Sequence, residues 1–413
     1  MRHTCRFCTE PLTEVVADLG LSPVSNHFRS AEAVRHDGRP FFPLVVMVCT
    51  SCWLVQLTKV KTPPHFHDDY VYFSSFSSSW LRHSEVYAKA MIKRLGLGED
   101  SLVVELASND GYLLQYFKAA GVPVMGVEPS CNVAEQAKMT HGIDSIVEFF
   151  SDALARKMAA DGRMADLIVG NNVLAHVPDI GDFVSGLRHI LKSEGTVTFE
   201  FPHLLRMLEE GQFDTIYHEH FSYLSLLAVE KVATAYGLEV YGIEEQGTHG
   251  GSLRIYLRHK DADVSDIGLA EGLAKVRADE AAAGLDTLSP YRVFRALPAT
   301  RKMALMEFLI DVRRAGKTVV GYGAPAKGNT LLNYCEIGPE LLPFTTDLNP
   351  AKQGKYLPGV NIPVMAPDEI DRVKPDYVLI LPWNLREEIA EQLAHIRDWG
   401  GLFVVAMPTL EVF

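Results

Sequence analysis

The chain has 413 residues, of which 47% are hydrophobic, and its formal net charge is −13. This length predicts two or three domains, and the acidic balance argues against a nucleic-acid partner, because phosphate binding needs a basic face. No apolar run approaches the roughly 20 residues of a membrane span, and residues 1–10 lack the apolar core of a signal peptide. We therefore expect a cytoplasmic, monomeric protein without a membrane partner.

Four of the six cysteines form two Cys-x-x-Cys pairs, Cys5 with Cys8 and Cys49 with Cys52. Two such pairs supply the four thiolates of a tetrahedral zinc site, although the loop of about forty residues between them exceeds that of the usual zinc ribbon. We predict a structural zinc, because four thiolates leave no open coordination position. A redox pair and four unrelated buried cysteines are the two alternatives.

Residues 69–79 combine aromatic and hydroxyl side chains, including Tyr72. This composition suits neither a core helix nor a simple linker. It predicts a lid or a cleft wall, and a tethered surface loop is the alternative. Residues 84–95 then have the periodicity of an amphipathic helix.

A buried strand over residues 102–106, a turn of small and polar residues and a helix over 112–120 come next. A second strand ends in Glu128, about 20 positions past the first turn, where an acidic residue can accept both hydroxyls of a ribose. Strands and helices continue to alternate, which predicts a mostly parallel sheet with ligands beyond the carboxyl ends of its strands. Strands at 238–245 and 252–258 are expected to pair antiparallel at the sheet edge. The candidate ligand-binding residues follow the strand ends: Glu105, Ala107, Asn109, Asp110, Gly111, Glu128, Pro129, Glu148, Phe149, Asn171 and Asn172, with His176 close behind.

The first turn lacks the dinucleotide fingerprint G-x-G-x-x-G, and Ala107, Asn109 and Gly111 occupy its spacing. Asp110 would repel a pyrophosphate, whereas it would attract an ammonium group. A strand-end acid, a polar turn and a ribose-binding acid together favour S-adenosylmethionine, which is cationic at sulfur and carries an ammonium group. An NAD site with a degenerate loop is the alternative.

Residues 264–315 have a mostly helical pattern, and a second α/β unit begins near residue 317. Its turn, Gly-Tyr-Gly-Ala-Pro-Ala at 321–326, comes nearer to the dinucleotide pattern, with Lys327 beside it and Asp347 closing the next strand. The helix that follows presents its N-terminus to a diphosphate. Spacing leaves open whether that diphosphate belongs to NAD or to a nucleotide-linked substrate.

The stretch Tyr217-His218-Glu219-His220 is dense in acid–base groups. Three interpretations of its histidines compete: satisfied core or surface groups, metal ligands, and catalytic groups. A neutral histidine is suited to removing a proton at physiological pH. Glu219 would orient it, and Tyr217 would donate a hydrogen bond to a developing oxyanion.

In these motifs and their order the chain resembles the nucleotide-sugar C-methyltransferases of deoxysugar biosynthesis, over essentially its whole length. Ala107 departs from the glycine common at its place in related methyltransferases, and His218 stands where some members have aspartate. The resemblance rests on the two cysteine pairs and on seven further motifs: Ser25-Asn26-His27-Phe28-Arg29, Glu105-Leu106-Ala107-Ser108-Asn109-Asp110-Gly111, Gly126-Val127-Glu128-Pro129-Ser130, Asn172-Val173-Leu174-Ala175-His176, Tyr217-His218-Glu219-His220-Phe221, His249-Gly250-Gly251 and Gly321-Tyr322-Gly323-Ala324-Pro325-Ala326-Lys327.

The resemblance implies an α/β fold class with four parts. These are a zinc-binding domain at 1–70, a class I methyltransferase domain with a Rossmann-like fold at 71–260, a helical linker at 261–316 and a second Rossmann-like domain at 317–413. The resemblance also implies S-adenosylmethionine as donor and a nucleotide-linked keto-deoxysugar as acceptor, held between the two Rossmann-like domains. The residues expected to bind the acceptor are Tyr72, His249, Gly323, Lys327, Asn329, Asp347, Trp383 and Asn384.

Under this resemblance, His220 removes the proton on the carbon next to the sugar ketone, and Tyr217 hydrogen-bonds the enolate oxygen. The carbon then attacks the methyl group on the sulfonium. Tyr72, His176 and Glu219 are supporting catalytic candidates. Two other functions stay open: an O- or N-methyltransferase acting on a nucleotide-sugar, and an NAD-dependent oxidoreductase that uses the second Gly-rich turn.

Overall fold

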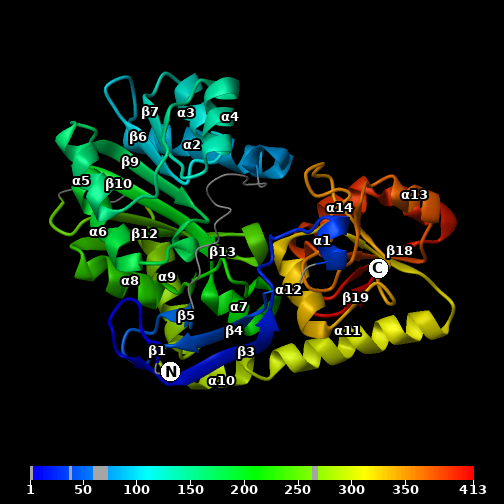
Figure 1. Cartoon of the computed structure of the whole chain (residues 1–413). Coiled ribbons are helices and arrows are strands. Elements are labelled where there is room, and N and C mark those ends of the chain that lie inside the picture. Colours follow the sequence, from blue (N-terminus) through cyan, green and yellow to red (C-terminus); the bar gives the residue numbers. More distant parts are fainter. Residues whose placement is uncertain (1–2, 37–39, 59–72, 263–267) are drawn as a thin grey trace.

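The computed structural model describes residues 3–36, 40–58, 73–262 and 268–413. Their strands form one two-stranded pair and sheets of four, seven and six strands. In Figure 1 the N-terminal strands (blue) lie below the central sheet (cyan to green), and the C-terminal unit (yellow to red) lies beside both.

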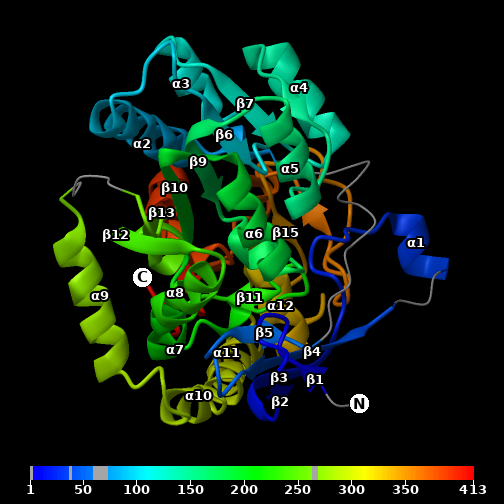
Figure 2. The same ribbon diagram turned by 90° about the vertical axis from the view of Figure 1, so that its left-hand side faces the viewer.

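The N-terminal unit is built on an antiparallel sheet in the order β11-β5-β4-β3. Its edge strand β11 (Ser222–Tyr223) arrives from far later in the chain, where Ser222 pairs with Gln56 and Tyr223 with Val55. Figure 2 shows β11 beside β5. The other elements of the unit are β1 (His3–Thr4), β2 (Pro11–Leu12), β3 (Glu14–Ser22), α1 (Ala31–His36), β4 (Phe42–Val48) and β5 (Val55–Leu57).

The central unit holds a seven-stranded sheet in the order β12-β13-β10-β9-β6-β7-β8. The strands from β10 to β8 run parallel, whereas β13 pairs antiparallel with both β10 and β12. The predicted parallel sheet and its antiparallel edge pair are confirmed. The strands are β6 (Val103–Leu106), β7 (Val124–Val127), β8 (Ser145–Ile146), β9 (Ala165–Asn171), β10 (Leu191–Pro202), β12 (Leu238–Gln246) and β13 (Ser252–His259).

Helix α2 (Ser78–Leu95) begins before the predicted residue 84, because the Ser77 side chain caps it by accepting a hydrogen bond from the Trp80 amide at 3.3 Å. The remaining helices of the central unit are α3 (Leu114–Ala119), α4 (Cys131–His141), α5 (Asp152–Ala160), α6 (Ile180–Ile190), α7 (Leu204–Glu210) and α8 (Leu226–Ala235). Four short 3-10 turns complete it: η2 (Ser74–Phe76), η3 (Leu174–His176), η4 (Phe213–Thr215) and η5 (Thr248–Gly250).

The C-terminal sheet has the order β16-β15-β14-β17-β18-β19, with every pair parallel except β18 with β19. It confirms the predicted second α/β unit. In the described part of the chain no helix has the length and apolar character to span a membrane. The elements from here to the C-terminus are α9 (Ala270–Ala282), α10 (Ser289–Phe294), α11 (Leu297–Arg314), β14 (Val319–Tyr322), α12 (Ala326–Cys335), β15 (Thr345–Thr346), β16 (Val364–Met365), α13 (Glu369–Val373), β17 (Tyr377–Ile380), η6 (Trp383–Leu385), α14 (Arg386–Gln392), η7 (Ala394–Trp399), β18 (Leu402–Val405) and β19 (Glu411–Val412).

The hydrophobic core joins the three units rather than filling each one separately. One buried cluster passes from the N-terminal strands through α7 and η4 into the C-terminal sheet, and includes Val16, Phe213 and Val404. A second cluster packs Cys5 and Cys49 against the central unit. The segment from η4 to β11 therefore lies where all three units meet.

Candidate active site

The turn after β6 is folded tightly by residues in the left-handed region. Ala107, Asn109 and Gly111 have φ values of 54°, 49° and 78°, a conformation that glycine adopts freely and other residues rarely. A Cβ on Gly111 would lie 2.8 Å from the Ile143 side chain. The turn therefore requires glycine at position 111, whereas it tolerates Ala107 at a cost in strain.

Buried acids surround this turn. Glu128 accepts hydrogen bonds from the amides of Asn109 (3.0 Å) and Ser130 (2.8 Å), and burial raises its pKa. Glu105 is fully buried, and the Tyr112 side chain is the polar group beside its carboxylate. Burial raises the pKa of Glu105 well above its usual value, and the carboxylates of Asp110 and Glu128 raise it further. Such crowded, desolvated acids fit a cationic ligand, as the ammonium and sulfonium groups of S-adenosylmethionine require.

The described part of the predicted lid segment, residues 73–79, lies on this turn. The Ser74 amide donates to Asn109 Oδ1 at 2.9 Å, and the Ser75 amide and hydroxyl donate to Asp110 Oδ2 at 3.2 and 2.5 Å. This segment therefore packs against the turn after β6, next to the site predicted for the methyl donor. Tyr72, predicted for both catalysis and acceptor binding, lies outside the described residues.

The other residues predicted to bind the methyl donor fall into two groups. Asn171 donates to the Tyr112 hydroxyl at 3.4 Å, and Asn172 contacts His249 Nε2 at 3.1 Å. Pro129 is half-buried beside Glu128, but Glu148 and Phe149 have exposed side chains after β8. Asn172 thus connects the donor side of the sheet to η5, which carries His249.

The turn between η4 and β11 carries the candidate base. His220 Nδ1 lies 2.9 Å from the Thr215 carbonyl oxygen, and His220 Nε2 lies 2.5 Å from the Tyr217 hydroxyl. Because a carbonyl oxygen only accepts, Nδ1 carries the hydrogen and Nε2 keeps its lone pair in the neutral ring. Tyr217 therefore donates to Nε2, and the two rings lie 3.9 Å apart between centroids.

His176 packs beside this pair, with its ring centroid 4.7 Å from that of His220. Burial lowers the pKa of His176 to about 4. Burial also lowers the pKa of His220 well below its usual value, and His176 lowers it further. Both histidines are therefore neutral at physiological pH, which is the form required of a proton acceptor.

Glu219 faces the N-terminal unit, not His220. Its Oε1 accepts from the Asn26 backbone amide at 3.3 Å and the Asn26 side-chain amide at 3.2 Å, and burial raises its pKa to about 7. Thr215, rather than Glu219, supplies the hydrogen bond that orients His220. His218 is buried, with its ring 6.0 Å from that of Phe42.

The C-terminal unit brings a cation to the same region. Lys327 Nζ donates to Asn384 at 2.7 Å and lies 4.6 Å from the centroid of the Trp383 ring. The Trp383 indole donates to Asp214 Oδ2 at 2.7 Å, and a Cβ on Gly250 would lie 2.4 Å from the same ring. Trp383 is therefore clamped between η4 and η5 of the central unit.

Asp214 was missed by the sequence analysis. It is fully buried, its Oδ1 has no partner in the described part of the chain, and burial raises its pKa to about 6 while Lys327 opposes the rise. The only signal in the sequence is an acid placed among apolar neighbours, between Phe213 and Ile216. That pattern is too common to single it out.

The remaining predicted acceptor residues have mixed surroundings. Gly323 has φ 84°, and a Cβ there would lie 2.5 Å from Pro382. Asp347 accepts from the Ala324 amide at 2.7 Å and from Lys352 at 3.1 Å, so its carboxylate is already paired. Asn329 is buried beneath the turn. The group that faces the central unit is thus Lys327, Trp383 and Asn384.

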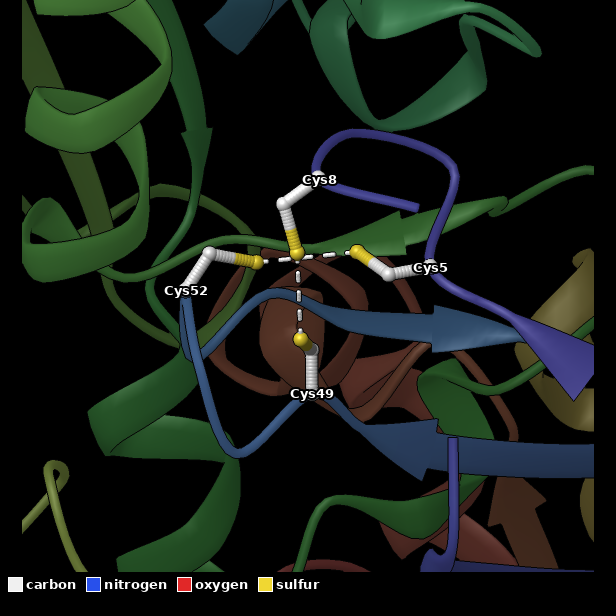
Figure 3. A group of neighbouring side chains, drawn as sticks. All are labelled: Cys5, Cys8, Cys49 and Cys52. Atoms are coloured by element: carbon white, nitrogen blue, oxygen red, sulfur yellow. Dashed lines mark hydrogen bonds between the residues drawn. The ribbon is translucent and has the colours of Figure 1, made fainter. Parts of the chain in front are cut away.

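The four cysteines come together in one cluster (Figure 3). The Sγ atoms of Cys5 and Cys52 lie 3.6 Å apart, those of Cys8 and Cys49 lie 3.4 Å apart, and all four are within 4.8 Å of one another. Tetrahedral zinc, with bonds of about 2.3 Å, spaces its thiolates by about 3.8 Å. The cluster therefore fits structural zinc, and among the described residues it is the sole group of three or more potential metal ligands that lie together.

The sheet order, the buried acids around the first turn and the cysteine cluster define a class I S-adenosylmethionine-dependent methyltransferase with a structural zinc. Three family models match in succession: "Putative zinc binding domain" at 5–66, "Methyltransferase domain" at 80–242 and "C-methyltransferase C-terminal domain" at 247–408. C-methyltransferase NovU of Streptomyces niveus is 34% identical over 404 residues, which cover 98% of this chain and 95% of that protein. The chain belongs to this C-methyltransferase family.

Solved structures also resemble parts of the chain. Magnesium protoporphyrin IX methyltransferase of Synechocystis PCC 6803, with bound SAH, is 14% identical, with 43% of this chain and 81% of that one covered and a TM-score of 0.34. The CcbJ methyltransferase of Streptomyces caelestis is 13% identical, with 43% and 89% covered and a TM-score of 0.34. The family models, the full-length relative and the cysteine cluster confirm the predicted family, fold class and cofactors.

Proposed function

We propose that this C-methyltransferase adds its methyl group to the ring carbon next to the ketone of a nucleotide-linked keto-deoxysugar. One observation carries the proposal. The neutral His220 keeps its Nε2 lone pair beside the Tyr217 hydroxyl, at the place where the central and C-terminal units meet. A carbon acid next to a ketone needs such a base together with a donor for the oxygen.

The chain's own residues divide the proton transfer between them. When a ketone enters, the Tyr217 hydroxyl turns from His220 to the ketone oxygen, which frees Nε2 to accept the ring-carbon proton. The C–H electron pair becomes the enolate, whose oxygen Tyr217 stabilises. A positioned base contributes about 10²–10⁴-fold, and an oxyanion donor about 10²–10³-fold. His176 helps to keep the His220 ring neutral before the reaction.

The donor is held by the acids of the first turn. Glu128 accepts one amide hydrogen bond on each oxygen and retains lone pairs for ribose hydroxyls. Glu105 and Asp110 face the amino-acid part, whose ammonium group relieves their mutual repulsion. S-adenosylmethionine supplies the electrophilic methyl group that the enolate carbon accepts.

The acceptor's diphosphate is assigned to Lys327 and the N-terminus of α12. Lys327 uses one N–H on Asn384 and has further N–H groups for phosphate oxygens. The helix N-terminus adds backbone donors and a favourable dipole. The nucleotide-linked sugar then extends from this helix toward His220 and His249.

We place the enzyme in the cytoplasm, as a monomer.

The test is incubation of the purified enzyme with methyl-labelled S-adenosylmethionine and a panel of nucleotide-linked keto-sugars, in deuterated water. The expected result is label on a ring carbon of one sugar and, without the donor, exchange of that carbon's hydrogen. Label on oxygen or nitrogen would favour the alternative methyltransferases, and tightly bound NAD with no transfer would favour an oxidoreductase. His220→Ala should abolish both transfer and exchange, whereas His395→Ala, an exposed histidine of the C-terminal unit, serves as the matched control.

A further inference from the structure

The catalytic turn is attached to the zinc-bearing N-terminal unit immediately after His220. Strand β11 completes the N-terminal sheet by pairing with β5. The Phe221 carbonyl accepts a hydrogen bond from the Leu57 amide at 3.0 Å, and the Phe221 amide donates to the Ala175 carbonyl at 2.8 Å. Phe221 thus links β5 of the zinc-bearing unit to η3, which carries His176.

A side chain from the zinc loop reaches the same peptide. Arg6 lies between Cys5 and Cys8, and its Nη2 donates to the Phe221 carbonyl and, at 2.9 Å, to the Ser222 hydroxyl. The Arg6 amide donates to Gln56 Oε1 at 2.9 Å. Gln56 in turn donates from its side-chain nitrogen to Cys5 Sγ at 3.1 Å. The cysteine cluster, Gln56 and Arg6 form one connected chain of contacts that ends on the residue after His220.

A second side chain from the N-terminal unit holds the residue before His220. Asn26 donates both its backbone and its side-chain N–H groups to one oxygen of Glu219. Three residues later, the Arg29 amide pairs with the Tyr356 carbonyl at 3.0 Å, so this segment also contacts the C-terminal unit. Hydrogen bonds from Arg6 and Asn26 therefore hold the residues on both sides of His220, although Arg6 and Asn26 precede it by about two hundred positions.

We propose that the zinc-bearing unit acts in catalysis as a positioning element, in which Arg6 and Asn26 hold the turn of Tyr217, Glu219 and His220 in its working geometry. The inference rests on the proposed role of His220. Neither residue takes part in bond making. Misplacement of reacting groups by about 1 Å can cost about 10²-fold in rate. Loss of the Arg6 or Asn26 contacts should therefore lower kcat and leave the KM for S-adenosylmethionine unchanged.

The experiment compares Arg6→Met, Arg6→Lys and Asn26→Ala with wild type. For each protein we measure kcat, both KM values, zinc per chain and the amide hydrogen exchange of residues 216–224. We expect Arg6→Met to retain zinc and its donor KM within twofold, to lose at least about 10-fold in kcat, and to exchange faster in this segment. Arg6→Lys should recover part of the rate, since lysine can make one of the two hydrogen bonds.

The matched control is Lys231→Ala, because Lys231 also contacts the zinc loop, at the Ser51 carbonyl (3.1 Å), but through an exposed hydrogen bond from α8. It should keep kcat within twofold. A zinc-loaded Arg6→Met with wild-type kcat and unchanged exchange overturns the inference. If that variant loses zinc, Asn26→Ala decides, because Asn26 lies outside both Cys-x-x-Cys pairs and bonds Glu219. Unchanged kcat and exchange in Asn26→Ala would equally overturn the inference. If the wild-type enzyme methylates none of the sugars, the proposed function is refuted. Amide hydrogen exchange of residues 216–224 then still tests whether Arg6 and Asn26 hold this segment.

Discussion

Glu219→Gln should remove a pH dependence of stability that its burial creates. Burial raises the pKa of Glu219 from 4.5 to about 7, which corresponds to about 3 kcal/mol. Because the folded-state pKa exceeds the unfolded one, the associated stability is fully present below pH 4.5 and is lost as pH rises through about 7. Gln keeps an oxygen acceptor for Asn26 but does not titrate.

The assay is urea unfolding of wild type and Glu219→Gln at pH 5 and pH 8, followed by tryptophan fluorescence. The difference in unfolding free energy between the two proteins should shift by about 2–3 kcal/mol in favour of the variant from pH 5 to pH 8. The new amide nitrogen replaces an oxygen that has no partner among the described residues. Its burial cost is the same at both pH values and cancels in this comparison.

The surface substitution Glu99→Gln provides the control, since Glu99 is exposed after α2. Its difference from wild type should be the same at pH 5 and pH 8. If the Glu219→Gln difference also stays constant within about 0.5 kcal/mol, Glu219 titrates normally and the reasoning from its burial is wrong.

Three further predictions follow from the same contacts. Asp214→Asn keeps an oxygen for the Trp383 hydrogen bond but removes the charge that opposes the lowering of the Lys327 pKa by burial. Steady-state kinetics should therefore give a KM for the sugar about 10-fold higher, or about 1.4 kcal/mol, and an unchanged KM for S-adenosylmethionine; equal effects on both KM values would contradict this. Chelation should release one zinc per chain and lower Tm by about 10 °C, because structural zinc contributes folding energy; an unaltered melting curve after zinc loss would rule this out. Ala107→Gly should raise Tm by about 2–4 °C, because it relieves about 1 kcal/mol of left-handed strain; a lower Tm would show that Ala107 is unstrained.

Features encoded by residues close together in the chain were predictable. The strand, turn and acid sequence that ends at Glu128 follows from apolar periodicity and from spacing, and the cysteine pairs follow from their three-residue steps. The density of acid–base groups at Tyr217 to His220 likewise marks the candidate site without reference to the fold. Motif order over the full length was then enough to reach the correct family.

Contacts between distant segments were not predictable, because nothing local specifies them. The expectation that the neighbouring Glu219 orients His220 follows naturally from adjacency, yet the Thr215 carbonyl makes that hydrogen bond and Glu219 turns to Asn26. The local signal at Asp214 is too common to single it out, because its importance comes from Trp383 of another unit. The sequence identifies Tyr217 and His220 as candidate acid–base residues. The geometry of their turn depends on η4, the zinc loop and the C-terminal sheet, which only long-range packing brings together.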